Sequence, residues 1–147
     1  MGVKVLVTRL DKDLPLPSYA KGGDAGADLV TRLDVTLEPG ERKLVPTGIS
    51  IALPDGYVAL VHPRSGLAIK HGVTMVNSPG TVDAGYDGEI KVIVYNTNPQ
   101  SYQIKKGQKI AQAVLCPVIN GKFVTLHEVI ELNEKERGSN GFGSTGI

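Results

Sequence analysis

The sequence predicts an all-β fold, either a sandwich or a jelly-roll barrel. Short runs rich in β-branched and aromatic residues recur at near-regular spacing along the 147 residues. Its 18 glycines and 9 prolines supply many turns between these runs. The length suits one domain with a real hydrophobic core and is too short for two.

Each predicted strand is bounded by residues that favour turns. The turn pairs are Pro39-Gly40, Asp55-Gly56, Asp87-Gly88, Asn98-Pro99 and Asn120-Gly121. The predicted strands lie within residues 3–7, 27–31, 34–39, 43–54, 56–63, 73–77, 89–96, 102–107, 109–119 and 123–132. Such even punctuation is typical of a sandwich or a jelly-roll barrel.

One stretch departs from the strand pattern. Residues 64–72 read RSGLAIKHG, with Ser65 as a candidate N-cap and Gly72 as a helix stop. Lys70 and His71 would lie in the last turn, where cations are favourable. The sequence therefore predicts a helix of about two turns here.

Residues 77–96 read NSPGTVDAGYDGEIKVIVYN, which predicts a β-hairpin whose first arm is rich in small residues. Asp83 lies on that first arm, whereas Asp87 joins Gly88 in the expected turn. We therefore expect Asp87 to serve the turn, which leaves Asp83 free for chemistry. Tyr86 lies between the two aspartates.

The C-terminus is polar, rich in glycine and without periodicity, so we expect a barrel domain over residues 1–132 and a flexible arm over 133–147. Gly141, Gly143 and Gly146 match the dinucleotide pattern GxGxxG, but no helix can follow them because the chain ends. The arm instead offers a cation, an aromatic ring and two hydroxyls, which could close over a nucleotide.

Charge and composition exclude several classes of protein. The net charge is +1 without blocks of one sign, so a nucleic-acid interface is unsupported. Cys116 is the single cysteine, and we expect a buried structural thiol. No segment approaches the roughly 20 apolar residues of a membrane span, so we expect a cytoplasmic protein without membrane partners.

Two stretches have the residue types of an anion site. Arg64 and Ser65 open the predicted helix, where free amides and the helix dipole attract phosphate, although a plain N-cap explains them equally well. Asp28 lies in a glycine-rich turn, where aspartates commonly bond backbone. If Asp28 and Asp83 both lie near phosphates, Mg²⁺ is implied, since carboxylates otherwise repel phosphates. Gln112 could bond a phosphate or the backbone.

Five ordered stretches together resemble the motifs of the trimeric deoxyuridine triphosphatases. They are AGADL (25–29), PRSGLA (63–68), NSPGTVDAGYDGEIKV (77–92), GQKIAQ (107–112) and RGSNGFGSTG (137–146). The resemblance implies a distorted jelly-roll barrel and a homotrimer with active sites shared between subunits. It also implies Mg²⁺-assisted hydrolysis of dUTP to dUMP and pyrophosphate, which limits uracil in DNA and supplies dUMP for dTMP synthesis.

The resemblance also implies roles for single residues. Asp83 matches the general base that activates the attacking water. Asn77 and the backbone of Thr81, Val82 and Asp83 match the part that reads uracil. Tyr86 matches the ring packed on the deoxyribose, and Lys91 falls on a strand that contacts substrate.

The remaining matches concern the phosphates and the metal. Arg64, Ser65, Gly66 and Gln112 match phosphate-binding positions, and Asp28 matches a residue that supports the water shell of Mg²⁺. In the arm, Arg137 is expected at the γ-phosphate and Phe142 on the uracil. Gly143, Ser144 and Thr145 are expected near the phosphates. Lys109 and Asp87 depart from the residues common in relatives.

Two other functions remain open from the sequence. A dCTP deaminase resembles this family, but the extra glutamate that it needs would fall in a stretch that reads Lys91, Val92, Ile93. A nucleotide-binding domain without catalysis is the second alternative, and the presence of both Asp83 and the arm motif argues against it.

Overall fold

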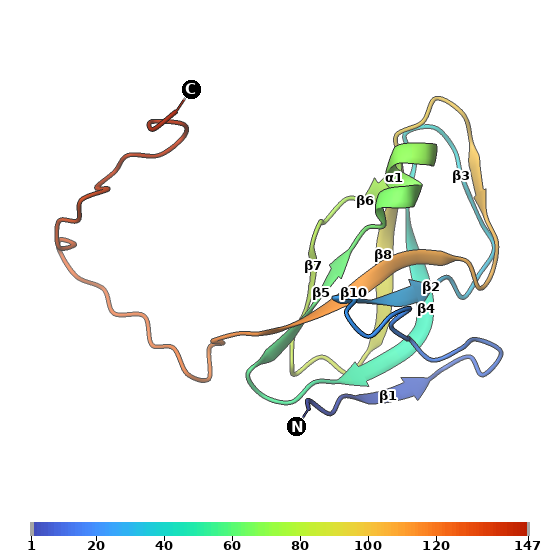
Figure 1. The fold of residues 1–147 in the computed structure, drawn as a ribbon, viewed down its shortest axis with the longest axis horizontal. Helices are drawn as coiled ribbons and strands as arrows, with labels where there is room; N and C mark the ends of the chain where they lie inside the picture. Colours follow the sequence, from blue (N-terminus) through green and yellow to red (C-terminus); the bar gives the residue numbers. More distant parts are fainter. Residues whose placement is uncertain (1, 147) are drawn as a thin grey trace.

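The computed structural model describes residues 2–146, which contain ten strands and one helix (Figure 1). The mainly β fold with one short helix confirms the predicted class. The elements are β1 Leu6–Arg9, β2 Gly26–Val30, β3 Val35–Leu37, β4 Arg42–Ala52, β5 Tyr57–His62, α1 Ser65–His71, β6 Val73–Met75, β7 Gly80–Val82, β8 Glu89–Asn96, β9 Tyr102–Ile104 and β10 Lys109–Pro117.

Two four-stranded antiparallel sheets enclose the core. Their strand orders are β1-β4-β8-β6 and β2-β10-β5-β7, and β3 pairs with β9 in a separate ribbon. Strand β8 shows the alternation that makes this possible, since Ile90, Val92, Val94 and Asn96 are buried and the residues between them are more exposed. Apolar side chains of both sheets meet in one cluster.

Helix α1 spans the residues predicted, and Gly72 ends it with a positive φ of 64°. The N-cap was assigned wrongly, however. The cap is Arg64, whose φ of −102° and ψ of 132° are extended, and it makes no side-chain capping bond. Ser65 is already the first helical residue, because the extended Pro63-Arg64 step ends β5 directly before it.

The predicted hairpin over residues 77–96 is wrong. Strand β7 pairs with β5 in one sheet, whereas β8 pairs with β4 and β6 in the other, so the segment 83–88 crosses between sheets. Its tight turn is Asp83–Tyr86, closed by a 3.1 Å bond from the Tyr86 amide to the Asp83 carbonyl. Asp87 and Gly88 therefore follow the turn rather than form it.

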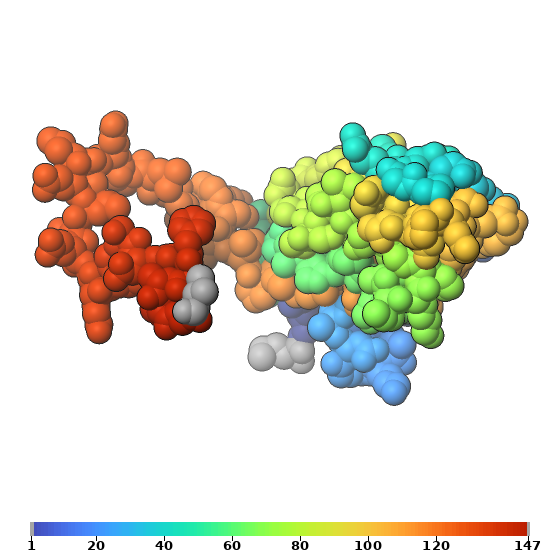
Figure 2. All heavy atoms as spheres, turned by 90° about the horizontal axis from the view of Figure 1, so that it is seen from above, coloured from blue at the N-terminus to red at the C-terminus, as the bar shows by residue number. Residues whose placement is uncertain are grey.

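Residues 118–146 form an arm that contains neither helix nor strand (Figures 1 and 2). Its first residues stay attached to the barrel, since the Val118 amide donates to the Gly56 carbonyl over 2.8 Å and Lys122 pairs with Asp55. The remainder extends away from the barrel. The strand predicted at 123–132 does not form in the single chain, because no neighbouring strand lies beside it to complete a ladder. Its apolar side chains are consequently exposed, with Leu126 at 92% and Ile130 at 102%. The division at residues 132 and 133 stays a prediction.

Two smaller expectations concern the thiol and the membrane. Cys116 is unpaired and only half-buried, since it lies near the end of β10 where the chain leaves the barrel. Within residues 2–146, no helix has the length and apolar character needed to cross a membrane.

Candidate active site

One cavity gathers most of the predicted phosphate-binding residues, and we call it the β2–α1 cavity. It is lined by Ala20, Asp24, Ala25, Gly26, Asp28, Arg64, Ser65, Gly66, Lys109 and Gln112. Strand order explains the gathering, because β10 lies between β2 and β5 and places Gln112 opposite both Asp28 and His62. Helix α1 starts three residues after the end of β5, so its first turn reaches the same edge.

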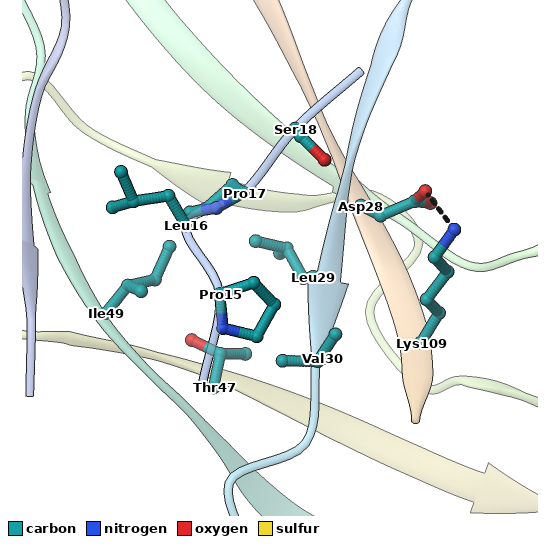
Figure 3. A pocket seen from close by; sticks show the side chains of 10 residues that line it. All are labelled: Pro15, Leu16, Pro17, Ser18, Asp28, Leu29, Val30, Thr47, Ile49 and Lys109. Carbon is teal, nitrogen blue, oxygen red and sulfur yellow. Dashed lines mark ion pairs between the residues drawn. The ribbon is translucent and has the colours of Figure 1, made fainter. Parts of the chain in front are cut away.

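Asp28 is the electrostatic centre of this cavity. Its carboxylate lies 3.6 Å from Nε of Arg64 and 3.0 Å from Nζ of Lys109, and its side chain is only 18% exposed. Two cations therefore share one largely covered carboxylate, and both also line the cavity, where an anion could compete with Asp28 for them. Figure 3 shows the pair of Asp28 and Lys109 beside a small pocket that the segment 15–18 closes.

Gln112 is partly committed to the backbone. Its Nε2 donates to the Pro63 carbonyl over 3.1 Å, which ties β10 to the segment before α1. Its side chain also lies across Gly26, where a Cβ would come within 2.2 Å of Oε1. Glycine at position 26 is therefore required for this arrangement, and the amide still lines the cavity.

The start of α1 offers backbone donors at the same place. Ser65 and Gly66 are exposed, and the first amides of a helix have no partner within it. The carboxylate of Asp24, in contrast, accepts from the Lys21 amide over 3.0 Å, so this aspartate serves its own turn.

A second cavity contains the predicted catalytic residue, and we call it the β7–β8 cavity. It is lined by Leu44, Thr81, Val82, Asp83, Tyr86, Glu89, Ile90 and Lys91. Asp83 is exposed, and within residues 2–146 its carboxylate has no hydrogen-bond or ion-pair partner. Asp83 directly follows β7, and its carboxylate can accept a hydrogen bond from substrate or water.

Tyr86 is fixed beside this aspartate. Its hydroxyl donates to the Glu89 carbonyl over 2.7 Å, although the residue is 47% exposed. The small residues before β7 also have a structural reason. A Cβ on Gly80 would lie 3.3 Å from Nδ2 of Asn77, so Asn77 lies close over this backbone, although it does not line the cavity.

The arm residues reach neither cavity in the single chain. Phe142 is fully exposed, and Arg137 bonds only locally, from Nε to the Asn140 carbonyl over 2.9 Å. Gly143, Ser144 and Thr145 are exposed as well. The described chain thus presents the predicted site residues in three separate places.

The two cavities share no lining residue. Within residues 2–146 no group of three His, Cys, Asp or Glu side chains is arranged to hold a metal directly. Asp28 and Asp24 nevertheless give the β2–α1 cavity carboxylate oxygens that can bond metal-bound water, which is how Mg²⁺ often contacts proteins.

Three residues of these cavities escaped the sequence reasoning. Lys109 completes the charge cluster, Gly26 makes room for Gln112, and Glu89 accepts the Tyr86 hydroxyl. The glycine inside a strand was a usable signal, because such glycines mark close approach of another group.

Comparison with known proteins gives a consistent result. The dUTPase family model matches residues 12–146. The deoxyuridine 5′-triphosphate nucleotidohydrolase of Thermobifida fusca is 61% identical over 145 residues, which cover 98% of this chain and 79% of that protein. The protein of the same description from Clostridium kluyveri is 51% identical, over 98% of this chain and 99% of that protein.

Solved structures agree with the sequence matches. The dUTPase of Staphylococcus bacteriophage 80alpha, solved with dUpNHpp, superposes with a TM-score of 0.89 at 30% identity, covering 98% of this chain and 99% of that one. A mutant dUTPase from phage phi11 of S. aureus, described with a structural Mg(II) ion, gives a TM-score of 0.81 at 26% identity, covering 89% and 99%.

Proposed function

The chain belongs to the dUTPase family and hydrolyses dUTP to dUMP and pyrophosphate, and on this premise we propose how its residues divide the work. The observation that carries the proposal is the free Asp83 carboxylate beside Tyr86, in a cavity separate from the cations around Asp28. Asp83 activates water, and the β2–α1 cavity of another subunit holds the phosphates.

Asp83 acts as the general base. Its unpartnered carboxylate can accept a proton from a water molecule placed in line with the α-phosphorus. The water oxygen forms the new bond to phosphorus, the bond from phosphorus to the bridging oxygen breaks, and pyrophosphate leaves with the electron pair. Positioning and charge stabilisation supply most of the acceleration in such reactions.

The base and the sugar are read at the β7–β8 cavity, with Asn77 contributing from beside Gly80, outside the cavity lining. Asn77 and the backbone of Thr81, Val82 and Asp83 present donors and acceptors to the uracil edge. The amino group of cytosine would face a hydrogen-bond donor of the protein, so both donors would be buried without an acceptor. Unpaired buried groups of this kind can favour dUTP over dCTP by a factor of about 10⁴. Tyr86 closes the space beside C2′, so the 2′-hydroxyl of a ribose would clash or be buried without a hydrogen-bond partner. Either outcome weakens the binding of UTP relative to dUTP by roughly 1–3 kcal/mol.

The triphosphate is bound by Arg64, the amides of Ser65 and Gly66, and Gln112, with Lys91 reaching the substrate from β8. Asp28 supports the water shell of Mg²⁺, as it lines the same cavity. When bound, Mg²⁺ neutralises phosphate charge and orients the chain of phosphates. In the absence of substrate the two cations are held by Asp28, so they are already placed for an anion.

The active site is shared between subunits of a homotrimer. The separation of the two cavities supports this, because one chain alone does not bring Asp83 to the phosphate-binding side chains. The exposed apolar run 123–132 supports it as well, since apolar side chains at this density need a partner surface. The arm then carries Arg137 and Phe142 to a site on other subunits, where Gly143, Ser144 and Thr145 meet the phosphates.

Deamination of dCTP is not supported. Strand β8 carries a single carboxylate, that of Glu89, which accepts from the Gly48 amide over 2.9 Å and lies 3.3 Å from Arg32. The stretch after it presents Lys91 to solvent and buries Val92.

Pyrophosphate release with Mg²⁺ and dUTP, followed beside an ammonia assay with dCTP, tests the proposal. We expect rapid pyrophosphate release and no ammonia. Release of ammonia at a comparable rate would establish the deaminase instead, and a silent assay with retained dUTP binding would establish a non-catalytic binding domain. Light scattering tests the assembly, and an active monomer would refute the shared site.

A further inference from the structure

We propose that Gly88 and Glu89 are positioning residues that hold the Tyr86 ring in place and thereby set the discrimination of dUTP against UTP. The inference rests on the proposed role of Tyr86 beside the sugar. Gly88 contacts the ring, and Glu89 accepts the hydrogen bond of its hydroxyl. Neither residue needs to touch the nucleotide for this role.

Gly88 gives the ring its place. A Cβ on residue 88 would lie 2.6 Å from the Tyr86 hydroxyl oxygen, 2.7 Å from Cζ and 3.0 Å from Cε1. The ring therefore packs directly on the Gly88 backbone, at a distance that any side chain would prevent. Because Tyr86 is 47% exposed, the ring has open space into which an added methyl group would push it.

Glu89 provides the anchor for the tyrosine hydroxyl. The hydroxyl donates to the main-chain carbonyl of Glu89, and the side chain of the same residue is fixed independently. Its Oε2 accepts from the Gly48 amide over 2.9 Å and from Nη1 of Arg32 over 3.3 Å, and the side chain is 15% exposed. The residue is thus held at both its backbone and its carboxylate.

An irregularity in β4 explains why a carboxylate is needed there. Pro46 pairs with Lys91 and Ser50 with Glu89, so three residues of β4 face Ile90 alone. The ladder is interrupted at this bulge, and the Gly48 amide would lose its partner. The Glu89 carboxylate takes that amide, while the Thr47 hydroxyl donates to the Ile90 carbonyl over 2.6 Å.

Arg32 extends the anchor to the rest of the barrel. Its Nη2 donates to the Leu10 carbonyl over 3.2 Å, and its Nε lies 3.8 Å from the Asp11 carboxylate. The connection between the sheets is therefore tied to the N-terminal segment and to the chain after β2. A ring held in this way forms a rigid wall beside C2′, whereas a free ring would turn aside for a ribose hydroxyl.

Two alanine substitutions on the same connection form a matched pair. Gly88→Ala displaces the Tyr86 ring, whereas a Cβ on Gly85 meets nothing within 4 Å, and neither glycine has a positive φ. We expect Gly88→Ala to lower the ratio of kcat/KM for dUTP over UTP by about tenfold. Gly85→Ala keeps the ratio of the parent protein, and both variants keep its melting temperature within a few degrees.

Substitutions of Glu89 test the anchor separately. Glu89→Gln keeps an acceptor for the Gly48 amide and should change the ratio by less than about threefold, whereas Glu89→Ala should lower it by about tenfold. A purely structural role for Glu89 would lower the melting temperature but leave the ratio unchanged. If Glu89→Ala does not fold, the comparison of Gly88→Ala with Gly85→Ala decides.

Tyr86→Ala separates this inference from the proposed function. If the parent protein discriminates and Tyr86→Ala loses discrimination, the sugar-gate role stands. An unchanged ratio in a folded Gly88→Ala variant would then overturn the positioning role alone. If Tyr86→Ala keeps the parent ratio, the proposed gate itself is wrong.

Discussion

The barrel and the arm carry parts of one active site in opposite physical states. In the barrel, Asp28 is held by two cations and Gln112 by a carbonyl, so these side chains are arranged before substrate arrives. In the arm, Phe142 is fully exposed and Arg137 bonds only within its own turn. The difference supports the proposal that the barrel supplies chemistry and recognition at little ordering cost, whereas the arm acts by closing once substrate orders it.

The largest expected effect lies in the barrel. Asp83→Asn removes the proton acceptor but keeps the shape of the side chain, so kcat should fall by about 10³-fold. Affinity for a non-hydrolysable dUTP analogue, measured by calorimetry, should change by less than about threefold, because Asp83 faces the water. An active variant would remove Asp83 from the role of base.

Removal of the part of the arm beyond Leu132 should have the next largest effect. A chain that ends at Leu132 loses the closing segment, and we expect kcat/KM to fall by about 100-fold through loss of orientation and water exclusion. The melting temperature should stay unchanged, since residues 133–146 are almost entirely exposed. A truncated chain with a much lower melting temperature would show that the arm is part of the folded barrel.

Substitution of Phe142 alone should cause a smaller loss of kcat/KM than removal of the arm beyond Leu132. Phe142→Ala removes the ring proposed to stack on uracil, and base stacking on an aromatic ring contributes about 1–3 kcal/mol. We expect kcat/KM for dUTP to fall by about tenfold. Glu134→Ala is the control, because Glu134 is also exposed on the arm but lies outside both the resemblance and the apolar run 123–132. Equal losses in both variants would contradict the stacking role.

The smallest effect concerns the ion pair of Lys106 and Asp11, neither of which lines either cavity, although Asp11 also contacts Arg32. The hydrogen bond from Lys106, 2.9 Å from Asp11, holds the pKa of the Asp11 carboxyl below its ordinary value of 3.8. The same hydrogen bond raises the pKa of Lys106 above 10.5. Because folding lowers the pKa of Asp11 and raises that of Lys106, the ion pair contributes its full stability to the folded protein between pH values of about 3.8 and 10.5. This contribution is lost as pH falls below about 3.8, where Asp11 takes up a proton, or rises beyond about 10.5, where Lys106 loses one.

Lys106→Met should therefore lower the melting temperature by no more than about 3 °C near neutral pH. Thermal melts from about pH 3 to pH 11 should show the difference narrowing at both ends. Lys105→Met is the control, since Lys105 makes no side-chain ion pair within residues 2–146. A difference that is constant at every pH would show that the lysine stem, rather than its charge, stabilises the barrel.

Local patterns predicted the elements of the barrel well and their pairing poorly. Gly72 and the two basic residues before it identified α1, because a helix stop depends on a few adjacent residues. The hairpin at residues 77–96 was wrong because a jelly roll sends successive strands to different sheets, and strand alternation looks the same in both cases. The run 123–132 has the residues of a strand, but a strand also needs a neighbour.

The site shows the same limit. The motifs predicted roles for Asp83, Tyr86 and Arg64, whose residue types are chemically distinctive, and the structure places these residues beside cavities. They did not point to Glu89, because its proposed role depends on a bulge in β4 that lies 41 residues away along the chain. Gly88 was interpreted as a turn residue, and only the position of the Tyr86 ring shows why a side chain cannot be accommodated there.

Mixing two inactive variants tests the shared active site most directly. Chains with Asp83→Asn and chains that end at Leu132 are unfolded together, refolded in equal amounts and assayed for pyrophosphate release. If the arm acts on another subunit, random assembly gives about one quarter of the sites both an intact Asp83 and an intact arm, so activity returns to about that fraction. If each arm closes over its own Asp83, no site has both parts, and a mixture that stays inactive would contradict the account.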